Sequence, residues 1–242
     1  MKQTLPPITD KQKEIISNIF RFRFINRVQI QKLLHHQDYH RINIWLKDLT
    51  EKQYLQKDHK QTFEGQTKPT VYNLGINGIR FLKTQKNVNK SDLRKYYGES
   101  KKSEKFKKQC QLIVDVYLAI TQKYPDITLF FTRADFPAKG VIRDIMPSFG
   151  FIREEEGNRI AYICELFQYG KPRGYYPIRI KKFINFFKDE EDTRILFICA
   201  TSGLRNYIEK ITENMVNGES LSGNIYFKII TYQDLKELDI FL

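Results

Sequence analysis

The sequence predicts an α/β chain of the α+β kind, with an N-terminal winged helix-turn-helix and a C-terminal α/β domain built on a mixed sheet. Two observations support this class. Three short helical patterns are followed by two strand patterns around a polar loop, and from residue 104 a long helical pattern precedes strands that alternate with helices. Because 242 residues exceed one ordinary domain, we expect a winged helix over 1–88, a linker over 89–103 and an α/β domain over 104–242.

The composition favours a folded protein with a polyanionic partner. Hydrophobic residues make up 41% of the chain, which excludes a disordered polymer. Lys and Arg number 41 against 28 Asp and Glu, so the formal net charge is +13. This charge looks spread along the chain and not gathered on one amphipathic helix, which favours nucleic acid over a membrane surface. We therefore expect double-stranded DNA as the partner and no membrane association.

The cysteines and the start of the chain indicate a cytoplasmic protein. Cys110, Cys164 and Cys199 are odd in number, widely spaced and set in apolar runs, so we expect buried thiols in a reducing compartment and no disulfide. The first ten residues lack the apolar core of a signal peptide, and no run approaches the length of a membrane span.

The first three helices are predicted from caps and apolar spacing. Thr9 or Asp10 can cap a first helix, and Asn26 can cap a short second one. The third helix spans residues 39–53, where apolar side chains recur at i, i+3, i+4 and i+7 and form one buried stripe. The stripe consists of Ile42, Trp45, Leu46 and Leu49.

Two strands and a wing complete the first domain. Residues 54–57 and 70–74 read as strands on either side of the polar loop 58–69, and the helical pattern 76–86 follows Gly75. The spacing of the second and third helices is that of a helix-turn-helix, and the hairpin after them indicates the winged variety.

One face of the third helix carries polar and basic side chains that can reach base edges and phosphates. Protein docking is the alternative role for such a module, and basic residues on a helix are often only its solvated face. A metal site at the histidines is weaker, because no Cys or carboxylate cluster stands at ligand spacing. The side chains that we expect to contact DNA are Arg27, Lys32, His40, Arg41, Asn43, Lys47 and the wing residues Lys57, His59, Lys60 and Lys68.

The second domain is predicted as a helix followed by a mixed sheet. The unbroken apolar run 194–200 suits a central strand, and the helix before it makes the connection a parallel crossover. The turn between the second and third strands is placed at Gly157 and Asn158. The expected helices cover 104–124, 175–188, 204–215 and a terminal stretch from 232; the expected strands cover 127–132, 142–154, 159–169 and 224–230.

Two acids in these strands are the candidate site. Asp144 and Glu165 each lie in an apolar strand, where a carboxylate must be paired or must hold a cation. The hairpin places both on the same face of the sheet, where they can bind Mg²⁺, and such an ion activates water for attack on a phosphate. A tight turn sets Glu165 opposite Gly150, so Asp144 approaches only through a bulge, which Gly150 could provide, or through a wider loop.

Several blocks of the chain together resemble the replication-relaxation family of plasmid and mobile-element proteins. The blocks are RFRFINRVQIQKLL, RINIWLKDLTEKQYL, KPTVYNLGINGIRFL, IRDIMPSF, ICELFQYG, KKFINFF and RILFICATS. This resemblance implies an N-terminal winged helix joined to a domain like the PD-(D/E)xK nucleases, with a role in plasmid replication, DNA relaxation or mobilisation. Asp144 matches the first acid of the nuclease motif and Glu165 the second.

The chain departs from that motif at one position, because Phe167 stands where the nucleases have a Lys two residues after the second acid. The resemblance then offers Lys181 or Lys182 as the substitute, and Glu104 or Asp115 as the carboxylate from the preceding helix. The catalytic set is thus Asp144, Glu165, Lys182 and Asp115, with Asp144 and Glu165 as the metal ligands.

A degenerate, inactive site is the alternative. In that case Asp144 pairs with Arg143 or Arg179, and Glu165 pairs with Lys181 or Lys182. Tyr175, Tyr176 and Tyr207 are then packing residues and not nucleophiles. Three functions stay open: a mobile-element protein that binds DNA, a winged-helix transcriptional regulator whose second domain only dimerises or senses an effector, and an adaptor for replication or mobilisation proteins. A homodimer on a two-fold site is compatible with the first two.

Overall fold

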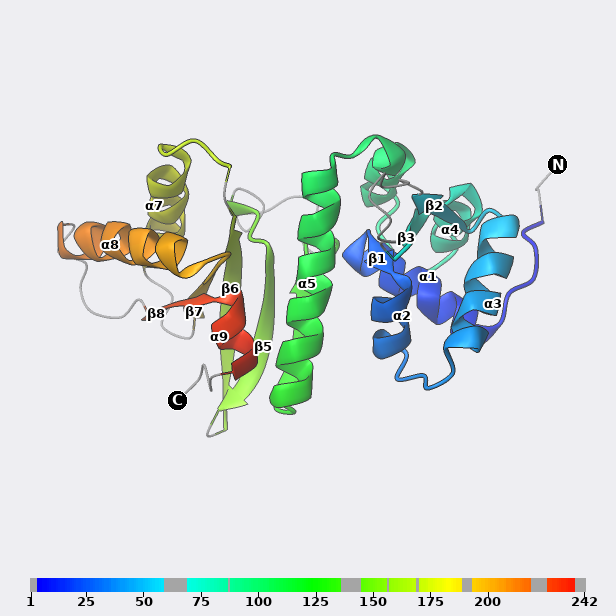
Figure 1. Cartoon of the computed structure of the whole chain (residues 1–242), viewed down its shortest axis with the longest axis horizontal. Coiled ribbons are helices and arrows are strands. Elements are labelled where there is room, and N and C mark those ends of the chain that lie inside the picture. Colours follow the sequence, from blue (N-terminus) through cyan, green and yellow to red (C-terminus); the bar gives the residue numbers. More distant parts are fainter. Residues whose placement is uncertain are drawn as a thin grey trace. The chain divides into compact units, whose positions relative to one another are not determined.

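The computed structural model describes residues 4–58, 69–86, 88–135, 145–155, 157–168, 170–188, 193–218 and 226–237. The chain forms two compact units, residues 1–118 and 119–242, which are described separately below. Figure 1 shows the elements of both units. Together they form a mixed α/β protein with two sheets, as the sequence predicts.

The first unit has the element order of a winged helix-turn-helix. A three-stranded antiparallel sheet in the order β1-β3-β2 stands beside three helices (Figure 1). The two predicted strands are confirmed to within one residue, and the two-residue strand β1 is an addition. The elements are α1 (Asp10–Phe22), β1 (Ile25–Asn26), α2 (Arg27–Leu33), α3 (Tyr39–Glu51), β2 (Leu55–Asp58), β3 (Val71–Leu74) and α4 (Ile76–Leu82).

Side-chain caps fix where the first two helices begin. Thr9 accepts a hydrogen bond from the backbone of Gln12, whose side chain accepts one from the backbone of Thr9. Asn26 and Gln29 repeat this reciprocal pair at the start of α2. Each reciprocal pair is a capping box, which satisfies backbone N–H groups that a helix leaves unpaired at its first turn. Both predicted caps are therefore confirmed.

The segment expected as a linker has regular structure. It contains η1 (Asp92–Lys101), a 3-10 helix with a kink at Gly98. Leu93 and Tyr96 are buried, and the Tyr96 hydroxyl donates to the Phe20 carbonyl at 2.7 Å. These residues therefore pack within the first unit, because their apolar side chains find cover there that composition alone does not reveal. The boundaries of the two predicted domains stay predictions.

The second unit is built on a five-stranded mixed sheet in the order β4-β5-β6-β7-β8. The β4-β5-β6 pairs are antiparallel and the β6-β7-β8 pairs parallel. The β5-β6 hairpin and the parallel crossover from β6 to β7 are as predicted. Helix α5 (Glu104–Lys123) crosses the division between the units. The other elements are β4 (Ile127–Thr132), β5 (Phe149–Glu155), β6 (Asn158–Phe167), α7 (Tyr175–Phe187), β7 (Thr193–Cys199), α8 (Ser202–Gly218), β8 (Tyr226–Thr231) and α9 (Tyr232–Glu237).

The β5-β6 hairpin has a different register from the predicted one. Glu155 pairs with Asn158, so the hairpin turns one residue earlier than predicted, and Gly157 supplies the positive φ of +83° that a tight turn requires. Gly150 then pairs regularly with Ile163, and the expected bulge at Gly150 is wrong. The shift of two residues keeps the paired residues of β5 and β6 on their predicted faces, whereas the described residues 145–148 of the predicted strand 142–154 lie outside β5.

The described part of the chain has no helix that is both long and apolar enough to cross a lipid bilayer. Cys110, Cys164 and Cys199 are buried free thiols, as predicted.

Candidate functional site

Helix α3 buries one face and exposes the other. Ile42, Leu46 and Leu49 are fully buried, while Trp45 is half-buried with its ring 5.1 Å from that of His36. The Asp38 carboxylate caps the helix by accepting from the backbone N–H groups of the next turn. The residues that the sequence assigns to the contact face are exposed as expected: His40, Arg41, Asn43 and Lys47.

The exposed face of α3 also carries apolar groups that the sequence reasoning did not assign. Tyr39 is 48% exposed and Ile44 is 60% exposed. An apolar side chain that stands off the buried stripe is the signal that could have identified them. In a DNA major groove, apolar side chains contact the thymine methyl group.

Cations surround the start of α3 and continue onto its neighbours. The Arg27 guanidinium lies 5.7 Å from the Tyr39 ring centroid and donates to Gln31 at 3.2 Å. Lys32 on α2 and Lys57 on β2 are exposed. The predicted wing contacts His59, Lys60 and Lys68 lie outside the described residues.

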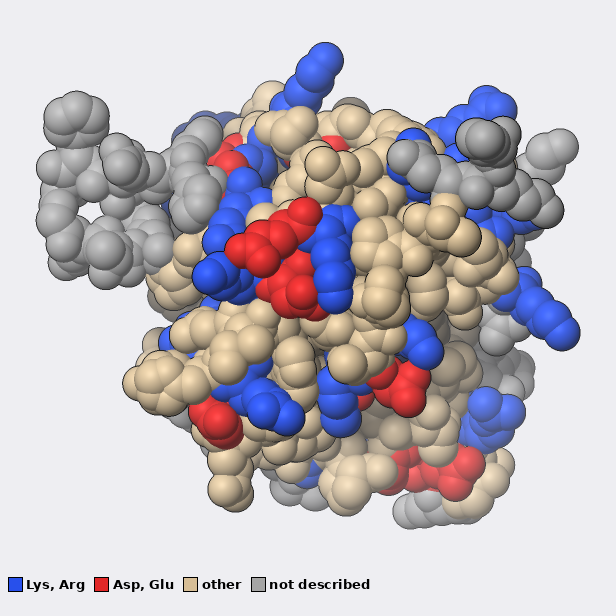
Figure 2. Space-filling view, turned by 90° about the vertical axis from the view of Figure 1, so that its right-hand side faces the viewer, with Lys and Arg blue, Asp and Glu red and all other residues tan. Residues whose placement is uncertain are grey.

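The net charge belongs to the first unit. Residues 1–118 contain 24 Lys and Arg against 11 Asp and Glu, a formal charge of +13, whereas residues 119–242 contain 17 of each. The charge is therefore segregated and not spread along the chain, which a count of each half of the sequence would have revealed. In Figure 2, Lys and Arg side chains are scattered among uncharged residues over the face shown, and Asp and Glu lie in a few small groups between them.

The second candidate, Glu165, lies in the interior of the second unit and is 2% exposed. It stands on β6 between Ile163 and Phe167, on the face of the sheet that packs against apolar residues of α7 and α8. With the corrected register, Ser148 just before β5 comes opposite Glu165. The hairpin thus brings a hydroxyl, and not a second carboxylate, to the Glu165 side chain.

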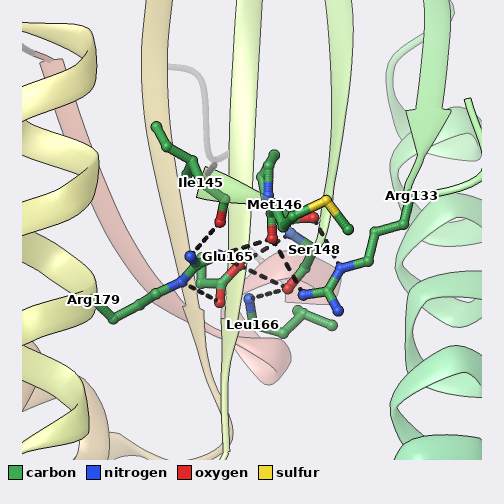
Figure 3. A network of polar contacts seen from close by, with 8 residues as sticks. Arg133, Ile145, Met146, Ser148, Glu165, Leu166 and Arg179 are labelled. Carbon is green, nitrogen blue, oxygen red and sulfur yellow. Dashed lines mark hydrogen bonds and ion pairs between the residues drawn. The ribbon is translucent and has the colours of Figure 1, made fainter. Parts of the chain in front are cut away.

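Both oxygens of the Glu165 carboxylate accept hydrogen bonds (Figure 3). Arg179 on α7 donates from Nε to Oε1 at 2.9 Å and from Nη2 to Oε2 at 3.0 Å, which is a two-pronged ion pair. Ser148 donates to Oε2 from its backbone N–H at 3.0 Å and from its hydroxyl at 2.9 Å. The partner of Glu165 is therefore Arg179 and not the expected Lys181 or Lys182.

Arg179 and a second arginine, Arg133, donate hydrogen bonds to the backbone of the irregular stretch just before β5. Arg179 also donates to the carbonyls of Ile145 and Met146, and Arg133 reaches the Met146 carbonyl from the other side at 3.3 Å (Figure 3). Met146 has a positive φ of 46°, which is unusual for a residue with a side chain. The guanidinium groups therefore satisfy carbonyls in a buried, non-regular stretch.

The described residues do not fit a Mg²⁺ ion at Glu165. The carboxylate oxygens are committed to Arg179 and Ser148, and the guanidinium charge occupies the side from which a cation would approach. No group of three or more His, Cys, Asp or Glu with metal-binding geometry exists among the residues that the structure describes. Asp144, the other expected ligand, lies outside that part of the chain.

The remaining predicted catalytic residues are not placed beside Glu165 by any observed contact. Lys182 on α7 is exposed. Asp115 belongs to the first unit, where it accepts a hydrogen bond from the Gln29 side chain at 2.8 Å. Glu104 forms an ion pair with Lys107. Their catalytic roles therefore stay predictions.

The nucleophilic side chains near Glu165 are held in their neutral forms. Burial raises the pKa of the Cys164 thiol well above its usual value, and the adjacent Glu165 carboxylate raises it further. Burial also raises the pKa of Tyr175, with Glu165 adding to the effect. The Tyr176 hydroxyl donates to the Gln168 carbonyl at 2.9 Å. These environments favour packing over nucleophilic attack.

Comparisons with known proteins identify no family. No family model matches the chain, and no curated protein matches it. Among solved structures, a match covers 96% of this chain and 45% of a chain of the restriction endonuclease FokI bound to DNA, with 12% identity and a TM-score of 0.29. This chain therefore spans less than half of the FokI chain, and a TM-score this low does not establish a shared fold.

Proposed function

We propose that this chain is a double-stranded DNA-binding protein that reads its site with α3. The observation that carries the proposal is the exposed face of α3, where Arg41, Asn43 and Lys47 stand beside apolar Tyr39 and Ile44 in a unit of charge +13. A helix in this position of a helix-turn-helix enters the major groove with its first turns. The concentrated charge supplies the affinity for phosphates that does not depend on sequence.

The biological role that we propose is replication initiation, DNA relaxation or mobilisation of a plasmid or other mobile element. It rests on the resemblance of the sequence blocks described above to the replication-relaxation family. Replication or mobilisation proteins would then be further partners, and a homodimer would match a two-fold DNA site. The second candidate is a transcriptional regulator with a non-catalytic second unit, which the buried and fully bonded Glu165 favours.

We further propose that the second unit has a PD-(D/E)xK-like fold without metal-dependent cleavage through Glu165. Arg179 occupies both oxygens of that carboxylate, and Phe167 stands in place of the motif lysine. The role left to the Glu165 network is structural, since it ties β6 to α7 and to the turn before β5.

Replacing two cations of α3 tests the proposed interface. For Arg41→Ala combined with Lys47→Ala, we expect the Kd for duplex DNA to rise at least about tenfold and the salt dependence of log Kd to fall by about 1 to 2, because phosphate and base contacts are lost. Fluorescence anisotropy with a labelled duplex over a salt series measures both. Arg173→Ala with Lys210→Ala removes the same charge from exposed positions of the second unit and should change the Kd less than twofold.

An α3 variant that binds as tightly as the wild type would reject the interface. A wild type without measurable DNA affinity at low salt would reject DNA binding itself and favour the protein adaptor.

A nicking assay tests the second unit. With supercoiled plasmid and Mg²⁺ or Mn²⁺, we expect no nicking above background, and no difference between wild type and Glu165→Gln, because the Glu165 oxygens are already bonded. The glutamine keeps the shape of the side chain and limits loss of folding. Metal-dependent nicking by the wild type that Glu165→Gln abolishes would overturn the proposal and restore Glu165 as a metal ligand.

A further inference from the structure

A short stretch of the first unit concentrates most of the excess charge. Residues 80–108 contain 11 Lys and Arg against three acids, Asp92, Glu99 and Glu104. None of the positions that the sequence reasoning assigned to DNA lies in this stretch. The net charge of +8 in 29 residues is more than half of the +13 carried by the whole chain.

The basic residues of this stretch lie on or next to α4, η1 and α5. Lys83, directly after α4, donates to the Tyr97 hydroxyl of η1 at 2.9 Å, and its ammonium lies 5.4 Å from the Tyr97 ring centroid. Helix α5 begins three residues after η1 ends. We call the exposed Lys and Arg side chains of residues 80–108 the basic strip. It includes Lys90 just before η1, Arg94 and Lys101 on η1, and Lys108 on α5.

Two of the three acids are paired with cations, Glu99 in the interior and Glu104 at the exposed start of α5. Glu99 is 1% exposed and accepts from Arg23 Nε at 2.9 Å. Glu104 pairs at 3.0 Å with Lys107, a buried lysine that also binds Asp58. On α1, by contrast, Lys11 and Lys13 each pair with an acid on the helix surface. Pairing thus neutralises two carboxylates of this stretch, one of them in the interior, while lysines and arginines of the same stretch stay exposed.

We infer that the basic strip is a second DNA-binding surface, which contacts the phosphate backbone irrespective of sequence. Flexible ammonium groups suit phosphates as point charges and carry little base discrimination. Among the described residues of this stretch, only one large apolar side chain, Tyr97, is exposed. The strip therefore lacks the continuous apolar face with which a surface helix enters a membrane. The inference rests on the proposed DNA binding and adds a surface distinct from α3.

Removing four charges from the strip tests it. The variant carries Lys90→Gln, Arg94→Gln, Lys101→Gln and Lys108→Gln, and the matched control carries Lys171→Gln, Arg173→Gln, Lys188→Gln and Lys210→Gln in the second unit. All eight side chains are exposed. Binding to a labelled 30-base-pair duplex of random sequence is measured over a salt series, with circular dichroism to confirm folding.

We expect the strip variant to bind at least tenfold more weakly, with a salt slope of log Kd reduced by about 3 to 4, since each phosphate contact contributes about 0.9. The control should bind within twofold of the wild type. A folded strip variant with the wild-type affinity and salt slope would overturn the proposal that the basic strip binds DNA. If Arg41→Ala with Lys47→Ala still weakens binding in that case, the proposal for α3 stands on its own. Wild type that binds anionic phosphatidylserine vesicles but no duplex overturns both.

Discussion

Arg179→Met is expected to destabilise the second unit by about 3–5 kcal/mol, because it leaves the Glu165 carboxylate buried without its counter-charge. Ser148 would still donate two hydrogen bonds to Oε2, but no cation would remain beside the carboxylate. The substitution also removes donors from the carbonyls of Ile145 and Met146. Methionine is close in length to the arginine stem, so the loss reflects charge and hydrogen bonds more than volume.

The unfolding of the two units can be followed separately. Trp45 is the single tryptophan and lies in the first unit, so its fluorescence reports on residues 1–118, while far-ultraviolet circular dichroism reports on both units. We expect Arg179→Met to shift the circular dichroism transition in urea and to leave the Trp45 transition in place. Lys182→Met, an exposed change on the same helix, should alter stability by no more than about 0.5 kcal/mol. A loss below about 1 kcal/mol for Arg179→Met would contradict a structural role of the ion pair.

Gly78→Ala is expected to destabilise the first unit by about 3 kcal/mol. A Cβ atom at Gly78 would lie 2.3 Å from the Tyr54 carbonyl oxygen, a backbone atom that cannot rotate away. Helix α4 would have to separate from the backbone of Tyr54, directly before β2. The better helix propensity of alanine offsets only about 1 kcal/mol of this cost. Urea denaturation followed by Trp45 fluorescence measures the change.

Gly98→Ala is the matched control for Gly78→Ala. A Cβ at Gly98 meets nothing within 4 Å, and its φ of −108° is accessible to alanine. We expect a change within about 0.5 kcal/mol. Equal stability of the Gly78→Ala variant and the wild type would mean that α4 does not pack this closely on β2.

The elements that the sequence predicts well are those whose signals are local. The caps at Thr9 and Asn26 and the apolar stripe of α3 each depend on residues within two helical turns, and all are observed. The parallel β6-β7 pair follows from a buried strand preceded by a helix. Strand β1 was missed, because two residues carry no periodicity and form a strand only by pairing with β3, where the partner of Ile25 is Tyr72, 47 residues further along the chain.

The candidate site was harder to predict because it depends on register and on helix orientation. A turn placed one residue late moves the partner of Glu165 from Ser148 to Gly150. The ion pair with Arg179 depends on which side of α7 faces the sheet, and the sequence offered Lys181 and Lys182 equally. Only the packing of Ile180 and Phe183 against the sheet directs Arg179 inward.

The network at Glu165 also shows that a carboxylate in an apolar strand does not by itself indicate a metal site. The acid stands on the central strand β6, and its neighbours supply an arginine and a hydroxyl. The same carboxylate that would hold a cation in a nuclease here holds three elements together. Function on this fold is therefore decided by the surrounding side chains and not by the acid alone.

The central claim is that DNA is bound by the first unit through α3 and not by the face around Glu165. Lysine acetylation of the whole chain, read by mass spectrometry with and without a duplex, tests this directly. We predict that DNA protects Lys47 and Lys57, together with Lys90, Lys101 and Lys108 of the basic strip, and leaves Lys182 and Lys210 as reactive as in the free protein. Protection of Lys182 with no protection of Lys47 would contradict the account.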